Sequence, residues 1–164
     1  MIEPPIPMSF IEGRGKDFLL FTYDVYMDIV RLHRYMPNAR EPKIMQLPNY
    51  KLVFPLWFAP AGSGLPTIVR SPGDEIWGIG WRTPIAELPK FEAKLSAPNR
   101  YHLMDIRVKN RAGDVLPAKT YSITIPQDPQ SKPSAAKLRE IMELGKTVGL
   151  PNEYLAKLGA TETL

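Results

Sequence analysis

Glu92 is the acidic residue whose placement best suits proton transfer. Ile85, Leu88 and Phe91 recur at three-residue spacing and define the inward face of a predicted helix. Glu92 follows Ile85 by seven residues, so a continued helix brings its carboxylate near that face. A carboxylate among apolar groups loses hydration, which raises its pKa toward the neutral range that a general acid or base needs. A partly exposed glutamate near a helix end fits the same spacing, because Pro89 weakens the turn.

Tyrosines form the second group of candidate site residues. Tyr23 ends the first apolar run and Tyr26 follows it in a loop, while Tyr101 and Tyr121 lie on later predicted strands. Phenolic hydroxyls that reach a cavity need partners and can orient a polar substrate there. The alternative is that these tyrosines are half-buried packing residues of a sheet.

Several kinds of chemistry are excluded by residue counts and missing motifs. The chain has no cysteine, which excludes disulfides, thiolate zinc sites, iron–sulfur clusters and a cysteine nucleophile. With only two histidines, a histidine-built metal site is not expected, and we interpret His33 and His102 as structural. The sequence contains no dinucleotide-binding, P-loop, nucleophile-elbow or zinc-protease motif. The residue counts and motifs therefore point to no metal site and to no familiar catalytic motif.

The charge pattern indicates a solvated surface. Lysines and arginines number 21 against 17 acidic residues, and the two signs are interleaved along the chain. Nucleic-acid binding would require the basic residues to cluster on one face. No apolar run approaches the ~20 residues that span a bilayer, and the N-terminus does not resemble a signal peptide. We therefore expect a cytoplasmic protein with no nucleic-acid or membrane partner.

The elements that position these residues are short, because 18 prolines among 164 residues interrupt the chain. We expect an N-terminal proline-rich arm over residues 1–17 and a single domain over residues 18–164. The predicted strands cover residues 18–23, 50–54, 67–69, 75–81, 101–108 and 118–125. Between them lie a predicted loop over residues 55–66, which carries Trp57 and Phe58, and a Ser-Pro-Gly-Asp turn over residues 71–74.

Helices are predicted over residues 27–35, after a Thr83-Pro84 start signal, after a linker over residues 126–133, and over residues 151–158. The third helix has the clearest apolar stripe, formed by Leu138, Ile141, Met142, Gly145 and Val148. Strands dominate the middle of the chain and do not alternate regularly with helices. The order predicts an α+β fold with a mixed sheet, curled into a small closed β-barrel ringed by helices.

The segment from Phe18 to Leu158 resembles the gamma-glutamylcyclotransferase family. The similar stretches occur in family order: an apolar strand ending in Tyr23, Pro37-Asn38-Ala39, residues 47–54 (LPNYKLVF), residues 71–78 (SPGDEIWG), the helix with Phe91-Glu92, the strand tyrosines, and residues 149–154 (GLPNEY). The resemblance implies a small closed mixed β-barrel ringed by helices, no cofactor, and a small-molecule substrate. Many members pair, so a homodimer is possible.

The resemblance also implies a reaction and the residues for it. Family members cyclise a gamma-glutamyl group: the α-amine attacks the γ-carbonyl, a transferase- or lyase-type step that releases 5-oxoproline and a free amine. The family's general acid/base glutamate corresponds to Glu92. The substrate-binding residues correspond to Tyr23, Asp24, Val25, Tyr26, Tyr101 and Tyr121.

The chain departs from the family in the loop after the first strand. The family's Tyr-Gly-Ser-Asn is replaced by Tyr23-Asp24-Val25-Tyr26, and the glycine that usually follows the glutamate is Ala93. Asp24 adds a negative charge where the family binds an anionic α-carboxylate. Three hypotheses remain: a cyclotransferase with shifted specificity, an enzyme that uses Glu92 for proton transfer on a more apolar biosynthetic intermediate, and a non-catalytic binding module.

Overall fold

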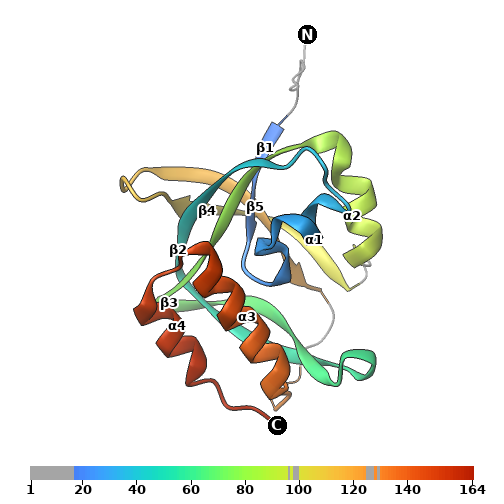
Figure 1. Cartoon of the computed structure of the whole chain (residues 1–164), viewed down its shortest axis with the longest axis vertical. Helices are drawn as coiled ribbons and strands as arrows, with labels where there is room; N and C mark the ends of the chain where they lie inside the picture. Colours follow the sequence, from blue (N-terminus) through green and yellow to red (C-terminus); the bar gives the residue numbers. More distant parts are fainter. Residues whose placement is uncertain (1–16, 96, 98–99, 125–127, 129) are drawn as a thin grey trace.

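The computed structural model describes residues 17–95, 97, 100–124, 128 and 130–164. Its centre is a closed barrel with the strand order β1-β3-β2-β4-β5 (Figure 1). The strands are β1 (Asp17–Thr22), β2 (Arg40–Phe58), β3 (Ser63–Pro84), β4 (Tyr101–Lys109) and β5 (Val115–Ile123). β1 and β5 run parallel where the barrel closes, at Leu20 and Lys119, and the other neighbours are antiparallel. The predicted α+β fold with a closed mixed barrel is confirmed.

β2 and β3 form one long hairpin, so the predicted loop over residues 55–66 is wrong. β2 continues to Phe58 and β3 begins at Ser63, leaving only a tight turn, in which Gly62 has a φ of 61°. Pro55 lies in the irregular pairing between Val53 and Leu56, where its missing N–H does not interrupt the ladder. Because prolines occupy such irregular positions, the sequence pattern of a continuous strand was interpreted as that of a loop.

The Ser-Pro-Gly-Asp segment lies inside β3 and is not a turn between two strands. β2 and β3 pair at Pro48 with Glu75 and resume at Tyr50 with Arg70, so residues 71–74 lie opposite Asn49 alone. Asn49 has a φ of 66°, and its side-chain oxygen accepts a hydrogen bond of 3.1 Å from the N–H of Gly73. The predicted turn is therefore a bulge that bends the hairpin.

The first helical segment is shorter than the predicted helix over residues 27–35. A 3₁₀ turn, η1 (Val25–Met27), follows β1, and α1 (Ile29–His33) follows it. Asp28 separates the two because its extended backbone interrupts the helix, and its side chain caps α1 by accepting from the N–H of Val30. Ile29 and Val30 are exposed, while Met27 and Leu32 are buried in the core.

Helix α2 (Leu88–Leu95) follows a 3₁₀ turn, η3 (Ile85–Glu87). The predicted helix start at Thr83-Pro84 is wrong, since Pro84 is the last residue of β3 and the hydroxyl of Thr83 donates to the carbonyl of Trp81 instead. Ile85 is 45% exposed, so it is not on the inward face that the three-residue spacing predicted. Phe91, by contrast, is fully buried.

Two helices, α3 (Ala135–Val148) and α4 (Asn152–Gly159), pack side by side on the lower part of the barrel (Figure 1). Leu138, Ile141 and Gly145 of the predicted stripe are buried, and Gly149 ends α3 in a left-handed conformation. Ser134 caps its start by accepting from the N–H of Lys137. Met142 and Val148 are half-buried, so the predicted stripe is confirmed in part, and the predicted linker over residues 126–133 lies partly outside the described residues.

The end of β1 is held tightly in the barrel core. The indole N–H of the buried Trp81 donates to the hydroxyl of Thr22 over 2.9 Å, and that hydroxyl donates to the carbonyl of Ile79 over 3.0 Å. A Cβ at Gly78 would lie 2.2 Å from the carbonyl oxygen of Thr22, so only glycine fits there. These contacts fix the point at which residues 23–26 leave the barrel.

Residues 1–16 of the predicted arm lie outside the described residues, and Asp17 already belongs to β1.

Candidate active site

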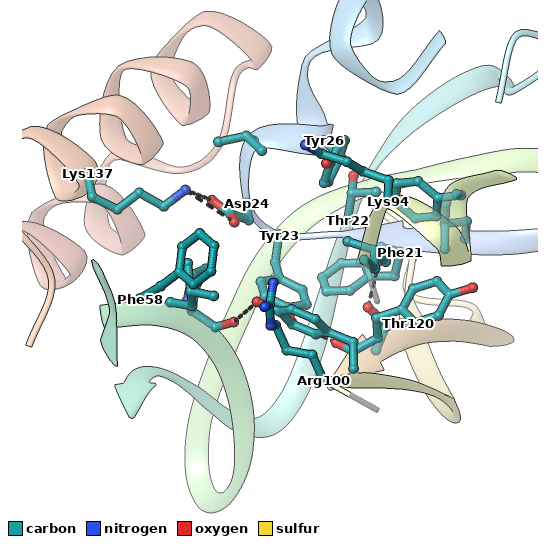
Figure 2. A pocket seen from close by; sticks show the side chains of 18 residues that line it. Phe21, Thr22, Tyr23, Asp24, Tyr26, Phe58, Lys94, Arg100, Thr120 and Lys137 are labelled. Atoms are coloured by element: carbon teal, nitrogen blue, oxygen red, sulfur yellow. Dashed lines mark hydrogen bonds and ion pairs between the residues drawn. The ribbon is translucent and has the colours of Figure 1, made fainter. Parts of the chain in front are cut away.

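A cavity of about 250 Å³ opens where β1 ends and residues 23–26 turn away from the barrel. Its walls come from all five strands and from η1, α2 and α3, so distant parts of the sequence meet there (Figure 2). Most of the wall is aromatic or aliphatic. The rings belong to Phe21, Tyr23, Tyr26, Phe58, Phe91, Tyr101 and Tyr121.

The predicted substrate-binding residues all line this cavity. They are Tyr23, Asp24, Val25, Tyr26, Tyr101 and Tyr121. Residues 23–26 reach it directly after β1, while the two later tyrosines lie on the adjacent β4 and β5. The predicted residues are thus neighbours in space, and whether they bind substrate stays a prediction.

Glu92 lies beside the cavity and not in its wall. α2 contributes Phe91, Lys94 and Leu95 to the lining, and Glu92 is rotated by about 100° from Phe91 on the same helix. Its half-buried carboxylate accepts a hydrogen bond of 2.9 Å from the hydroxyl of Tyr121, which does line the cavity. The hydroxyl of Tyr121 thus connects the carboxylate of Glu92 to the cavity.

The tyrosine hydroxyls of the wall are largely committed to protein acceptors. Tyr23 donates to the carbonyl of Tyr121 over 2.7 Å, and Tyr101 donates to the carbonyl of Pro66 over 3.3 Å. Together with the bond from Tyr121 to Glu92, these contacts fix three rings of the wall. The rings define the shape of the cavity and leave few free donors in it.

Burial raises the pKa of each of these tyrosines, because a phenolate would lose its hydration. Burial raises the pKa of Tyr26 to about 12, with smaller contributions from Tyr35 and Asp24. The pKa values of Tyr23 and Tyr101 are also raised, first by burial and then by nearby groups that include Asp24. At Tyr121 burial comes first and the bond to Glu92 second. All four are neutral near pH 7.

Asp24 and Lys137 form an ion pair at the edge of the cavity. The Nζ of Lys137 lies 3.1 Å from Oδ1 of Asp24, and the two side chains are only 16% and 19% exposed. Figure 2 shows the lysine reaching from α3 toward residues 23–26. Sequence reasoning missed Lys137, because nothing local links two residues that are 113 positions apart.

Two further cations in the wall were also missed. The guanidinium of Arg100 lies 4.6 Å from the ring centre of Phe58, and Lys94 comes from α2. Lys94 could have been found from the sequence, since it lies between Phe91 and Leu95, two apolar residues that are four positions apart on the same helix. Arg100 gave no such signal.

The two histidines have structural partners outside the cavity wall. A ring nitrogen of His33 lies 2.8 Å from the carbonyl of Ala39, and one of His102 lies 2.9 Å from the hydroxyl of Thr124. Within the part of the chain that the structure describes, no group of three histidine or acidic side chains could hold a metal ion. None of the described helices has the length and apolar character of a membrane span.

The arrangement suits a small molecule that has both apolar and charged parts. Aromatic walls can enclose the apolar part, Lys94, Arg100 and Lys137 can bind an anionic group, and Asp24 can bind a cationic one. A cavity of about 250 Å³ is near the low end for ligand sites, and it suits a ligand of amino-acid or dipeptide size.

Known proteins resemble the chain in both sequence and structure. No protein-family model matches it. The gamma-glutamylcyclotransferase of Mus musculus is 31% identical over 90% of this chain and 80% of its own length. The Homo sapiens protein of the same name is 28% identical over the same shares.

A solved structure described as a gamma-glutamyl cyclotransferase superposes with a TM-score of 0.80. It is 28% identical in sequence, and the match covers 91% of this chain and 90% of that one. The similar sequences and the similar barrel therefore span nearly the same residues. This chain belongs to the gamma-glutamylcyclotransferase family.

Proposed function

We propose that this protein is a cyclotransferase-type enzyme that releases 5-oxoproline from a gamma-glutamyl amine or peptide. Membership of the family supports the reaction class. The observation that carries the proposal is the cavity itself, whose wall includes every substrate-binding residue that the family resemblance predicts.

The geometry suits an intramolecular reaction. The α-amine and the γ-carbonyl belong to one molecule, so the protein mainly has to fold the substrate and stabilise developing charge. Tightly packed rings, such as Tyr26 and Phe91 with centres 4.9 Å apart, give the cavity a rigid wall for that folding. Lys94 and Arg100 supply the positive charge that a substrate carboxylate needs.

The proton-transfer role of Glu92 stays a prediction. In this structure its carboxylate would act through the hydroxyl of Tyr121, which could pass a proton to Glu92 while receiving one from a bound amine. We expect Tyr121→Phe to lower kcat as much as Glu92→Gln does if this relay operates, because the first change removes the relaying hydroxyl and the second removes the carboxylate that takes up the proton.

The experiment that tests the proposal uses a panel of gamma-glutamyl dipeptides and amides. We expect the wild-type protein to release 5-oxoproline from at least one of them, measured by mass spectrometry. Leaving groups with an apolar side chain, such as phenylalanine, should react better than glycine, because the wall is mainly apolar. No 5-oxoproline from any compound would contradict the proposal.

The aromatic wall also favours a second candidate, proton transfer on a more apolar biosynthetic intermediate. Seven rings around a small cavity are more than an amino-acid zwitterion requires. Tight binding of an uncharged aromatic compound that gamma-glutamyl compounds do not displace would favour this candidate. The third hypothesis, a non-catalytic binding module, is favoured by a surface Glu92 with no pocket beside it, whereas here a cavity lies next to Tyr121 and Glu92.

A further inference from the structure

Arg100 is a half-buried cation of the cavity wall, and no acidic side chain pairs with it among the residues that the structure describes. The other two cations of the wall are less available to a ligand. Lys137 is paired with Asp24 at 3.1 Å, which offsets its charge. Lys94 is exposed on α2, so water and salt screen its charge. An anionic group in the cavity would therefore find its strongest counter-charge at Arg100.

The side chain of Arg100 is held in place without the use of its hydrogen-bond donors. Its guanidinium lies over the ring of Phe58, 4.6 Å from the ring centre, where the aromatic face attracts a cation. Its backbone carbonyl accepts a hydrogen bond of 2.7 Å from the N–H of Thr124. A guanidinium has five N–H donors in a planar fork, and none of these donates to an acceptor in the described part of the chain.

Arg100 lies toward the opposite end of the cavity from Tyr121. On the paired strands β4 and β5, Tyr121 faces Leu103, whereas Arg100 precedes β4 and bonds to Thr124. Three strand residues separate Tyr121 from Thr124, which corresponds to about 10 Å along the sheet. In the proposed function the reacting atoms lie near Tyr121, because its hydroxyl connects Glu92 to the cavity. The departing part of the substrate then extends toward Arg100.

We infer that Arg100 binds the carboxylate of the departing amino acid and thereby selects gamma-glutamyl dipeptides over gamma-glutamyl amines. This inference rests on the proposed function, which leaves the two substrate classes open. The planar fork of an arginine matches a carboxylate and can donate two parallel hydrogen bonds to it. An amine without that carboxylate leaves the guanidinium without an anion. Arg100 touches no reacting atom, so its role is in specificity and not in the chemical step.

The charges around the cavity agree with a substrate of this class. The wall has three cations and Asp24, and Glu92 lies beside it, so one positive charge is in excess. A gamma-glutamyl dipeptide with an uncharged side chain has two carboxylates and one ammonium, so one negative charge is in excess. A gamma-glutamyl amide of a simple amine has no excess charge. The dipeptide therefore matches the charge of the site, and the amide does not.

A matched pair of substrates tests the inference on the full chain. The two are γ-glutamyl-phenylalanine and γ-glutamyl-phenethylamide, which lacks only the carboxylate of the departing group. We expect the wild-type kcat/KM to be at least about 10-fold higher for the dipeptide, the scale of a hydrogen bond to a charged group. Arg100→Gln should lower kcat/KM for the dipeptide and leave that for the amide nearly unchanged. Arg100→Lys should keep part of the preference, because it keeps the charge and loses the fork.

Two further variants serve as controls. Arg107→Gln, on the exposed part of the same strand β4, should leave both values of kcat/KM unchanged. Lys94→Gln, which removes the exposed cation of the wall, should change the preference less than Arg100→Gln does. Thermal unfolding of each variant shows whether the fold is kept.

The kinetic outcomes separate the inference from the proposed function. A loss in Arg100→Gln that is confined to the dipeptide supports the inference. Equal losses for the two compounds overturn it, because Arg100 would then bind the gamma-glutamyl part or support the fold. A wild type without a preference, or a preference that depends on Lys94 and not on Arg100, also overturns it. Each of these results leaves the proposed function standing.

If the wild type releases 5-oxoproline from neither compound, the proposed function fails and calorimetric binding decides the inference. Tighter binding of the dipeptide than of the amide by the wild type, lost in Arg100→Gln, would support the role of Arg100 as a carboxylate-binding residue. Equal binding of the two compounds by the wild type, or binding of neither, would overturn it.

Discussion

At the residue scale, the Asp24–Lys137 pair is the main electrostatic feature of the cavity. Both side chains are mostly buried, and they come from parts of the chain that meet only in the folded protein. Removing one member of such a pair leaves a charge with little hydration, which costs more than the pair itself contributes. Mutating either residue should therefore affect stability as well as activity.

We expect Lys137→Met to lower the free energy of unfolding by about 1–3 kcal/mol, because Asp24 loses its partner. The double variant Lys137→Met/Asp24→Asn should regain part of this loss, since no charge is then left unpaired. Urea denaturation measures both. The control is Lys119→Met, whose partner Asp105 is 84% exposed, with an expected change below about 1 kcal/mol. Additive losses in the double variant would contradict this account.

Which residues surround the cavity was largely predictable at this scale. Tyr23 to Tyr26, Tyr101 and Tyr121 were identified because their order in the sequence resembles the family's, and all of them line the cavity. Lys137 and Arg100 were not predictable, because their placement depends on how α3 and the start of β4 pack on the barrel. The exposure of Ile85 was not predictable, because this residue lies in the 3₁₀ turn η3, where the spacing of a regular α-helix does not hold.

At the scale of elements, the contact between β1 and β3 sets the exit of residues 23–26 into the cavity. Gly78 allows the carbonyl of Thr22 to approach closely, because a Cβ at this position would lie only 2.2 Å from that carbonyl oxygen. The same Cβ would also contact the ring of Phe21. Both neighbours belong to the buried core, so neither can move away easily. The position of the cavity loop thus depends on a residue that does not line it.

We expect Gly78→Ala to destabilise the protein by about 1–3 kcal/mol, the range for overpacking a core, and to lower activity by displacing residues 23–26. Thermal or urea unfolding, with kinetics on the folded fraction, measures both effects. The matched control is Gly80→Ala on the same strand. Its Cβ would meet the flexible side chains of Met45 and Leu19 at 3.0 and 3.1 Å, so the cost should be smaller. Equal stability of Gly78→Ala and the wild type would rule out this role.

Helices and strands were predictable where periodicity and caps agreed. α3 was predicted from its apolar stripe, and Leu138, Ile141 and Gly145 of that stripe are buried. β2 and β3 were underestimated, because their bulges contain proline, glycine and asparagine, which in isolation are typical of turns. Only the pairing of two long strands reveals that such residues lie within a hairpin.

At the scale of the whole molecule, buried tyrosines make the free energy of unfolding depend on pH in the alkaline range. Burial raises the pKa of Tyr23, Tyr26, Tyr101, Tyr121 and Tyr154 above the value of about 10 in an unfolded chain. Between pH 10 and 12 the unfolded chain has lost these protons while the folded chain keeps them. The unfolded state therefore binds fewer protons there, and stability falls as the pH rises.

We expect the free energy of unfolding to be unaffected by these tyrosines below about pH 9 and to fall steadily above pH 10. In a spectroscopic titration at 295 nm, the folded protein should show incomplete tyrosine ionisation at pH 11. Tyr26→Phe, which removes the group with a pKa of about 12, should make the decline shallower. Complete tyrosine ionisation at pH 10.5 in a protein that is still folded would show that these rings are not buried.

The shared barrel supports membership of the family, and the loop with Asp24 sets this chain apart from the family pattern. The most direct test of the central claim is to identify both products formed from γ-glutamyl-phenylalanine. Cyclisation predicts 5-oxoproline and free phenylalanine in equal amounts, with no glutamate. Glutamate in place of 5-oxoproline would mean hydrolysis, and unchanged substrate would mean no gamma-glutamyl chemistry; either result contradicts the account.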